Sequence, residues 1–165
     1  MLAVLENLAL LEMSVVLTAL AVITATVLGV MVGVEFAVAV FVGPILRRLP
    51  VGSWIEASAN GARVLGRVMP FWYIGSLLLV AGLAAAKWGG PAGVAAVAAA
   101  ALLVVSVVMS VTLLVPIANR STTWTADSHP ADWREQLRRW DRLHYVRVAV
   151  IVAGFVLTLV AARVA

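Results

Sequence analysis

The sequence predicts an all-α integral membrane protein, a four-helix bundle whose fourth helix extends into the cytoplasm. Three observations predict this class. Of the 165 residues, 64% are hydrophobic and 12% are charged, whereas soluble domains contain about 45–50% apolar residues. The mean hydropathy of the chain is +1.07. Residues 13–34 carry no charge over 22 positions, which exceeds the roughly 20 residues that a helix needs to cross a bilayer.

Four transmembrane helices are expected within a single domain of residues 1–165, at residues 13–41, 69–86, 92–118 and 131–163. The first should be retained in the mature protein, because the start of the chain carries Glu6 and Glu12 and lacks the basic region that opens a signal peptide. Residues 52–67 mix apolar and charged side chains. Such mixed segments often lie along the membrane interface, so a separate short helix is predicted there.

Prolines and small residues punctuate the later helices. Pro70 is tolerated in the first turn of the second helix, and residues 87–91 form a tight turn. Ser106 and Ser110 are small enough to let the third helix approach its neighbours, and Pro116 is expected to bend or end it. The fourth helix would be about 50 Å long, longer than the bilayer is thick, so its first third should project into the cytoplasm.

Charge and cysteine content exclude several classes of function. The net charge is +4 and the sequence pI is about 10.7, but ten of the twelve basic residues lie in or beside two loops next to the predicted spans. This bias is typical of cytoplasmic loops, so no nucleic-acid partner is expected. Both termini should lie outside and the large loops inside, across a bacterial inner membrane. The absence of cysteine excludes disulfide, iron–sulfur and thiolate–metal sites.

The start of the fourth helix, WREQLRRWDRLHYVR at residues 133–147, is the one place where this apolar chain gathers aromatic, basic, acidic and imidazole groups. Helical spacing puts a stripe of six residues on one face: Trp133, Leu137, Trp140, His144, Arg147 and Ile151. The uncharged run at residues 148–162 is only 15 residues long, too short for a hydrocarbon core of roughly 30 Å. His144 and Arg147 should therefore lie inside the membrane boundary, facing the bundle interior.

Glu35 is the second candidate site residue. It precedes Arg47 by 12 residues, or about 18 Å along a helix, which places it near the middle of the membrane. An ionisable group at that depth is costly and tends to mark function. We expect Glu35 to face His144 and Arg147 across one cavity with Trp140 on its wall, with an axial offset of roughly 10 Å between Glu35 and Arg147. An extended arginine covers part of this distance and a bend near Pro44 can shorten it; otherwise water or substrate fills the gap. A purely structural ion pair between Glu35 and Arg147 is the alternative.

Metal binding receives little support from the sequence. His129 and His144 are 15 residues apart without the spacing of helical metal ligands, so a metal or haem would need ligands from several helices. No metal is expected; if one is present, His144 and Glu35 are the expected ligands. No phosphate-binding loop, Ser-His-Asp arrangement or dinucleotide fingerprint is present.

Four segments carry a resemblance to a known family: GVEFAVAVFVGPIL at 33–46, GRVMPFW at 66–72, VPIANR at 115–120, and the segment at 133–147. Together they resemble the small four-helix membrane proteins typified by anthrone oxygenases of aromatic polyketide pathways. The resemblance implies that Asn119, Trp140, His144 and Arg147 are the matching polar positions. The chain differs at Val148, where members commonly carry a hydroxyl residue, and at Glu35, where many lack a carboxylate.

The resemblance also implies oxygenation of a phenolic, anthrone-like carbon acid without an obvious bound cofactor. The expected function is therefore that of a membrane-embedded, anthrone-oxygenase-like monooxygenase, which deprotonates a lipophilic aromatic substrate for reaction with dioxygen. His144 or Glu35 would be the general base, Arg147 and Asn119 would stabilise the enolate oxygen, and Trp140 and Trp133 would contact the rings. The alternatives are a metal- or haem-binding redox protein and a non-enzymatic small transporter or assembly subunit. The expected partners are a lipophilic small molecule and the bilayer, and a homo-oligomer remains open.

Overall fold

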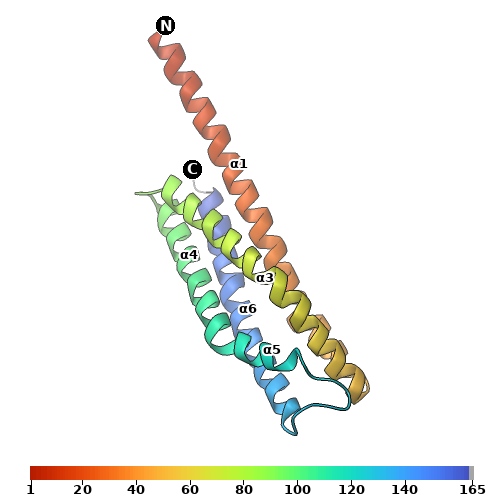
Figure 1. The fold of residues 1–165 in the computed structure, drawn as a ribbon. Coiled ribbons are helices and arrows are strands. Elements are labelled where there is room, and N and C mark those ends of the chain that lie inside the picture. Colours follow the sequence, from red (N-terminus) through yellow and green to blue (C-terminus); the bar gives the residue numbers. More distant parts are fainter. Residues whose placement is uncertain (164–165) are drawn as a thin grey trace.

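Four helical rods form the protein (Figure 1). The structure is a computed structural model that describes residues 1–163, and it contains no strand within them. The rods are built from the following elements: α1 (Leu2–Ala37), η1 (Val38–Val42) and α2 (Gly43–Leu46); α3 (Val51–Ala86); α4 (Pro91–Met109), η2 (Ser110–Leu114) and α5 (Val115–Ser121); and α6 (Trp133–Arg163). Each contains a helix long and apolar enough to cross a membrane. The predicted class, an integral membrane four-helix bundle, is confirmed.

A core shared by all four rods holds the bundle together. Helix α6 packs against α1 and α4, and α3 packs against the same two helices. Their common core contains Leu28 and Met31 of α1, Val80 of α3, Leu103 of α4 and Ile151 of α6, none of which is more than 1% exposed. Large apolar side chains cover much of the outer surface, as expected where lipid replaces water as the solvent.

The structure corrects the prediction of a separate interfacial helix at residues 52–67. Helix α3 runs without interruption from Val51 to Ala86 and contains Pro70 in its interior. Because the inward positions of residues 54–65 continue in helical phase through residues 69 and 73, one helix can present both segments to the same neighbours. The charged residues of this segment, such as Arg63 and Arg67, lie on its exposed side.

The other helix ends differ from the predicted ones by smaller amounts. The first helix begins at Leu2 rather than residue 13 and so includes Glu6 and Glu12. Its first turns extend past the ends of the other helices (Figure 1). The third rod continues to Ser121 beyond Pro116. The turn at residues 87–90 includes Gly89 at φ +86°, a conformation that glycine adopts without steric cost.

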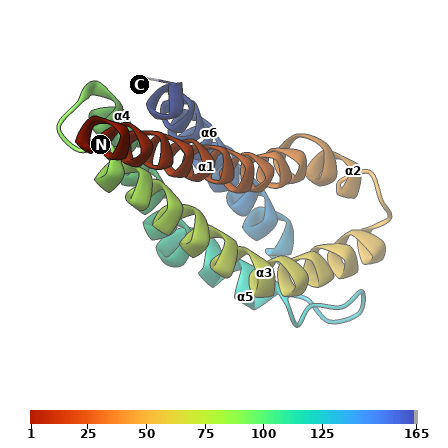
Figure 2. The same ribbon diagram turned by 90° about the horizontal axis from the view of Figure 1, so that it is seen from above.

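The end of the bundle opposite the chain termini is more open. The ribbons of α1 and α3 diverge toward α2 (Figure 2). Here the first turns of α6 carry Trp133, which packs with Ile55 and Trp124 in a small separate core. This second core fixes the projecting part of α6 against the start of α3, beside the part of the bundle that contains the candidate site.

Candidate active site

Three ionisable side chains meet inside the bundle. Arg147 of α6 donates from Nη2 to Glu35 Oε2 of α1 at 2.6 Å and from Nη1 to Ser110 Oγ of η2 at 2.9 Å. The same Nη2 lies 3.0 Å from His144 Nδ1. Glu35 is 4% exposed, His144 1% and Arg147 8%. Removal of an isolated charge from water is costly unless it is paired and hydrogen-bonded, and here the carboxylate and the guanidinium satisfy that condition for each other.

The partners of His144 determine which ring nitrogen carries its proton. A guanidinium only donates hydrogen bonds, so Nδ1 accepts from Arg147. A backbone carbonyl only accepts, so Nε2 donates to the Glu35 carbonyl at 3.2 Å. His144 is therefore neutral with its hydrogen on Nε2, and both nitrogens are occupied. Through these two hydrogen bonds His144 holds the Arg147 guanidinium and the backbone at Glu35 in position.

The axial offset of roughly 10 Å expected between Glu35 and Arg147 is closed in the structure, because the two side chains touch. Depths counted along two helices can be subtracted only if the helices are parallel, whereas α1 and α6 cross each other (Figures 1 and 2). The long side chain of Arg147 covers the remainder.

A π-helical turn, η1, begins three residues after Glu35. In η1 the Gly43 N–H bonds to the Val38 carbonyl, and the next residue, Pro44, has no N–H to offer the Ala39 carbonyl. Tyr145 of α6 supplies the missing donor, with its hydroxyl 2.7 Å from the Ala39 oxygen. Two neighbouring side chains of α6, His144 and Tyr145, thus bond to the backbone of the first rod and fix the position of Glu35.

A second π-helical turn lies on the third rod and has the same relation to a proline. In η2 the Val115 N–H bonds to the Ser110 carbonyl, and Pro116 follows. Short π-helical turns of this kind occur frequently at functional sites. Ser110, at the start of this turn, donates to the Ser106 carbonyl at 2.7 Å while its oxygen accepts from Arg147. The second turn therefore contacts Arg147 directly through Ser110, whereas the first turn contacts α6 through the Ala39 carbonyl.

A cavity of about 660 Å³ borders this cluster. Its wall includes Glu35, Arg147, Trp140 and Asn119, together with Tyr73 of α3. Most of the remaining lining is apolar, contributed by α3, η2 and α5. Ligand sites of this volume are usually apolar with a few polar groups that fix orientation, and the described wall has that composition.

Trp140 connects the cavity to the buried histidine. Its ring stacks on His144 with centroids 4.6 Å apart and an angle of 24° between the planes. The half-buried indole lies on the cavity wall, whereas His144 lies behind it and is not part of the wall. An aromatic ligand in the cavity would meet the Trp140 side chain rather than the imidazole.

Tyr73 Oη, Ser106 Oγ and Arg147 Nε are buried near the cluster and make no hydrogen bond of standard geometry among the described residues. The Tyr73 hydroxyl is nevertheless close enough to Ser106 and Glu35 to interact with both. The Arg147 guanidinium carbon also lies 5.5 Å from the centre of the Tyr73 ring. A buried donor left unpaired costs about 1–3 kcal/mol, and such groups in a native structure usually have a functional or ligand-related explanation.

The structure brings together most of the predicted site residues but separates one. Glu35, Arg147, Trp140 and Asn119 line the cavity, and His144 lies directly behind its wall. Trp133 is placed elsewhere, buried in the small core with Trp124 and at 4.8 Å from the Trp54 ring. Trp54 and Leu137 pack against this core and line the cavity, so Trp133 supports the cavity wall from behind.

The sequence did not identify three contributors to the site. Tyr73 was given no role, and Ser110 was interpreted as a small packing residue. Asp141 lines the cavity and pairs with Arg47 at 2.6 Å. Asp141 lies three residues before His144, a spacing that places the two on neighbouring positions of one helix face, but a partner on another helix leaves no local signal.

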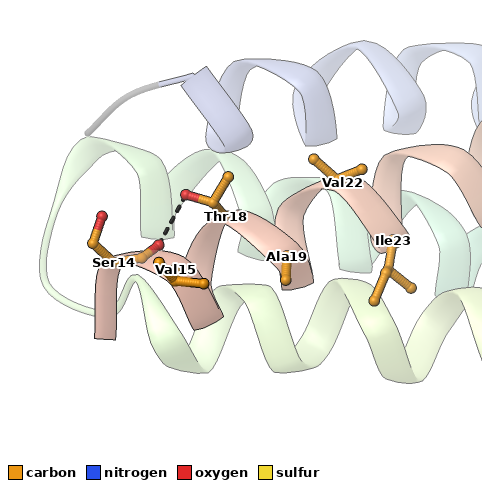
Figure 3. Close-up of a pocket in the computed structure, with 6 residues that line it drawn as sticks. All are labelled: Ser14, Val15, Thr18, Ala19, Val22 and Ile23. Carbon is orange, nitrogen blue, oxygen red and sulfur yellow. Dashed lines mark hydrogen bonds between the residues drawn. The ribbon is translucent and has the colours of Figure 1, made fainter. Parts of the chain in front are cut away.

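The described residues offer no cluster of side chains suited to a metal ion. No group of three or more His, Cys, Asp or Glu side chains lies close enough there to hold a metal ion. The expected pair of His144 and Glu35 approaches to 3.4 Å. A shallow hollow on the exposed side of α1, bordered by Ser14 and Thr18, contains an internal hydrogen bond of 2.8 Å from Thr18 to the Ser14 carbonyl (Figure 3).

These features define a class of protein: a four-span membrane protein that encloses a largely apolar cavity with a buried Glu-Arg pair at its wall. The chain belongs to the anthrone oxygenase family, whose family model matches residues 61–157. The matched segment contains Asn119, Trp140, His144 and Arg147, whereas Glu35 precedes it. No curated protein and no solved structure matches the chain.

Proposed function

We propose that the protein is a membrane-embedded oxygenase that acts on a lipophilic phenolic or anthrone-like aromatic. The observation that carries the proposal is the buried Glu35-Arg147 pair on the wall of a largely apolar cavity of about 660 Å³. The pair offers a base and an anion-stabilising group side by side. The apolar wall suits a substrate that partitions from the bilayer.

Glu35 is the proposed general base. An anthrone has an acidic CH₂ group between two aromatic rings, and its deprotonation gives an enolate that extends to the ring carbonyl. Both nitrogens of His144 are engaged, and the ring lies behind Trp140, so His144 acts as a positioning residue. Arg147 binds Oε2 of Glu35; we therefore assign proton uptake to Oε1.

Arg147 is the proposed stabiliser of the enolate oxygen. Its guanidinium lines the cavity beside Glu35, and a preorganised cation next to developing negative charge is among the most effective catalytic devices. Tyr73 and Asn119, which line the same cavity, are the further candidate donors. Trp140 would pack against the aromatic rings.

Dioxygen completes the reaction. The carbanion passes one electron to O₂, and the two resulting radicals combine into a carbon-bound peroxide anion. This anion takes back the proton held by Glu35 to give the hydroperoxide, and loss of water converts the former CH₂ into a carbonyl. One dioxygen is consumed and one water is released, so the atoms and electrons balance without another reductant. In this scheme the residues supply deprotonation, orientation and exclusion of bulk water.

We also propose that the site opens toward the cytoplasmic half of a bacterial inner membrane, with both termini outside. The support is the distribution of arginines, ten of twelve basic residues lying beside the links at residues 47–50 and 122–132 or in the cytoplasmic parts of α3 and α6. The cavity lies toward the same end of the bundle as these links, because its wall includes Leu46, which precedes the first link, and Ser121, which precedes the second. The substrate would enter from the membrane.

The test is oxygen uptake and quinone formation by protein in lipid nanodiscs supplied with anthrone. Wild type should exceed protein-free nanodiscs, and Glu35→Gln should lose at least about 100-fold in rate, the contribution typical of a general base. Glu12→Gln, at an exposed carboxylate of the same helix, is the matched control and should match wild type. Equal rates for Glu35→Gln and wild type would refute the assignment of the base.

A metal or haem redox protein is the principal rival. Metal analysis and an absorption spectrum of the same nanodisc preparation address it directly. A stoichiometric metal or a haem band that tracks activity would favour the rival.

A further inference from the structure

One face of α3 forms a long wall of the cavity. The lining positions on this helix are 54, 57, 58, 61, 62, 65, 66, 69, 70, 73 and 74. The steps between them alternate between three and one, which keeps them on a single helical face. In its first half this face is made of small residues: Ala57, Ser58, Gly61 and Ala62. A Cβ atom added at Gly61 would meet no atom within 4 Å. The small side chains therefore border open space rather than a packed neighbour.

The cavity is larger than a three-ring aromatic requires. A cavity of about 150 Å³ accommodates one benzene ring, so the observed 660 Å³ could hold about four separate rings. Three fused rings share atoms and need less space than three separate ones. A ligand confined to three rings at Arg147 would leave a substantial part of the cavity unfilled.

The cavity is also elongated. Its wall extends on α6 from Leu137 to Arg147, about 15 Å along the helix, and on α3 from Trp54 to Tyr73, about 28 Å. Glu35, Arg147 and Tyr73 mark one end, while Ala57, Ser58, Gly61 and Ala62 lie on α3 between this end and Trp54. The other polar groups on the wall include Asn119, Ser121 and Asp141, whose carboxylate is paired with Arg47. The uncharged small-residue face of α3 is thus the part of the wall that suits an apolar group.

We infer that the ligand is an elongated amphiphile, with a phenolic or enolisable ring system at the Glu35-Arg147 end and an apolar extension along the small-residue face of α3. Gly61 is then a specificity-determining residue, because its missing side chain makes room for the extension. The identity of the ring system rests on the proposed function, whereas the extension rests on the shape of the cavity. A separate lipid acyl chain in the same space is the competing occupant.

The test compares two inert product analogues, 9,10-anthraquinone and 2-pentylanthraquinone, in binding to protein in nanodiscs by quenching of tryptophan fluorescence. Neither has the acidic CH₂ group, so binding is independent of turnover. The measured quantity is the ratio of their dissociation constants in each protein, because partition into the lipid is the same for every variant. Gly61→Leu should fill the open space, and leucine is a better helix former than glycine. The control is Gly82→Leu, at an exposed glycine of α3 that also has no atom within 4 Å of an added Cβ and is not on the cavity wall.

The expected result is that Gly61→Leu weakens binding of the pentyl compound at least 10-fold relative to the parent quinone, while wild type and Gly82→Leu share the same ratio. An unchanged ratio in Gly61→Leu would overturn the extension and favour a lipid chain as the occupant. Failure of the parent quinone itself to bind wild type would instead count against the proposed function. The two failures are thus distinguishable.

Discussion

Arg147 Nη2 lies 2.6 Å from Glu35 Oε2 although 112 residues separate them in the chain. Both residues are more than nine-tenths buried, in helices long and apolar enough to cross the membrane. The contact joins the first and last rods and places a carboxylate and a guanidinium on one cavity wall. The following predictions separate a catalytic use of this contact from a purely structural one.

Replacement of Arg147 by lysine tests the geometry of the cation. Arg147 donates to Glu35, Ser110 and His144 at the same time, and an ammonium group lacks the planar fork that makes this possible. Arg147→Lys should fold but lose at least about 10-fold in kcat/KM, or 1.4 kcal/mol of transition-state stabilisation. Steady-state oxygen uptake measures the change. Wild-type kinetics in this variant would mean that Arg147 serves only as a point charge.

A double substitution tests whether the pair is merely structural. Removal of one partner from a buried ion pair typically costs about 3–5 kcal/mol, whereas replacement of both by apolar residues is often tolerated. Glu35→Leu and Arg147→Met should each destabilise the protein, and the double variant should regain much of the lost stability in a detergent unfolding assay. All three should be inactive. Retention of activity by the double variant would show that the pair only joins α1 to α6.

His144 is expected to act through Arg147. His144→Phe removes both of its hydrogen bonds, whereas His144→Asn keeps an oxygen that can accept near the position of Nδ1. The fall in kcat should be smaller for His144→Phe than for Glu35→Gln, and His144→Asn should recover part of it. The opposite outcome, in which His144→Phe is as inactive as Glu35→Gln and asparagine gives no rescue, would identify His144 as the base.

The bond from Tyr145 to the Ala39 carbonyl makes a stability prediction. Tyr145→Phe leaves that carbonyl unpaired, because Pro44 has no N–H, and should cost about 1–3 kcal/mol. Pro44→Ala introduces a backbone N–H that can take over the bond. The two substitutions should therefore be non-additive, with the double variant more stable than Tyr145→Phe alone. Simple additivity in a double-mutant cycle would exclude this account of the π-helical turn.

Apolar composition and the cost of burying charge were sufficient to predict the class and part of the site. The charge-free runs predicted the spans because a lipid-exposed backbone must satisfy its own hydrogen bonds, which a long apolar helix does. Glu35 and Arg147 could be recognised because an ionisable group at that depth needs a partner, and the chain offers few. The stripe from Trp133 to Ile151 follows from helical periodicity alone.

The remaining features depend on how the rods cross, which local patterns do not encode. The contact between Glu35 and Arg147 arises from the crossing of α1 and α6 and from the reach of one side chain. The roles of Tyr145 and Ser110 depend on the two π-helical turns, whose prolines signal an interruption but not its form. The continuous α3 was missed because Pro70 was interpreted as a helix start, although an internal proline can be tolerated when neighbouring groups and local adjustments compensate.

The most direct test of the central claim is hydrogen exchange at the acidic carbon without dioxygen. Anthrone would be incubated anaerobically in deuterated buffer with the protein in nanodiscs, and deuterium at the CH₂ carbon would be followed by mass spectrometry. We predict that wild type accelerates exchange over protein-free nanodiscs, that Glu35→Gln reduces this to the background rate, and that Glu12→Gln behaves as wild type. Exchange by Glu35→Gln at the wild-type rate, or no acceleration by wild type, would contradict the assignment of Glu35 as the base that deprotonates the substrate.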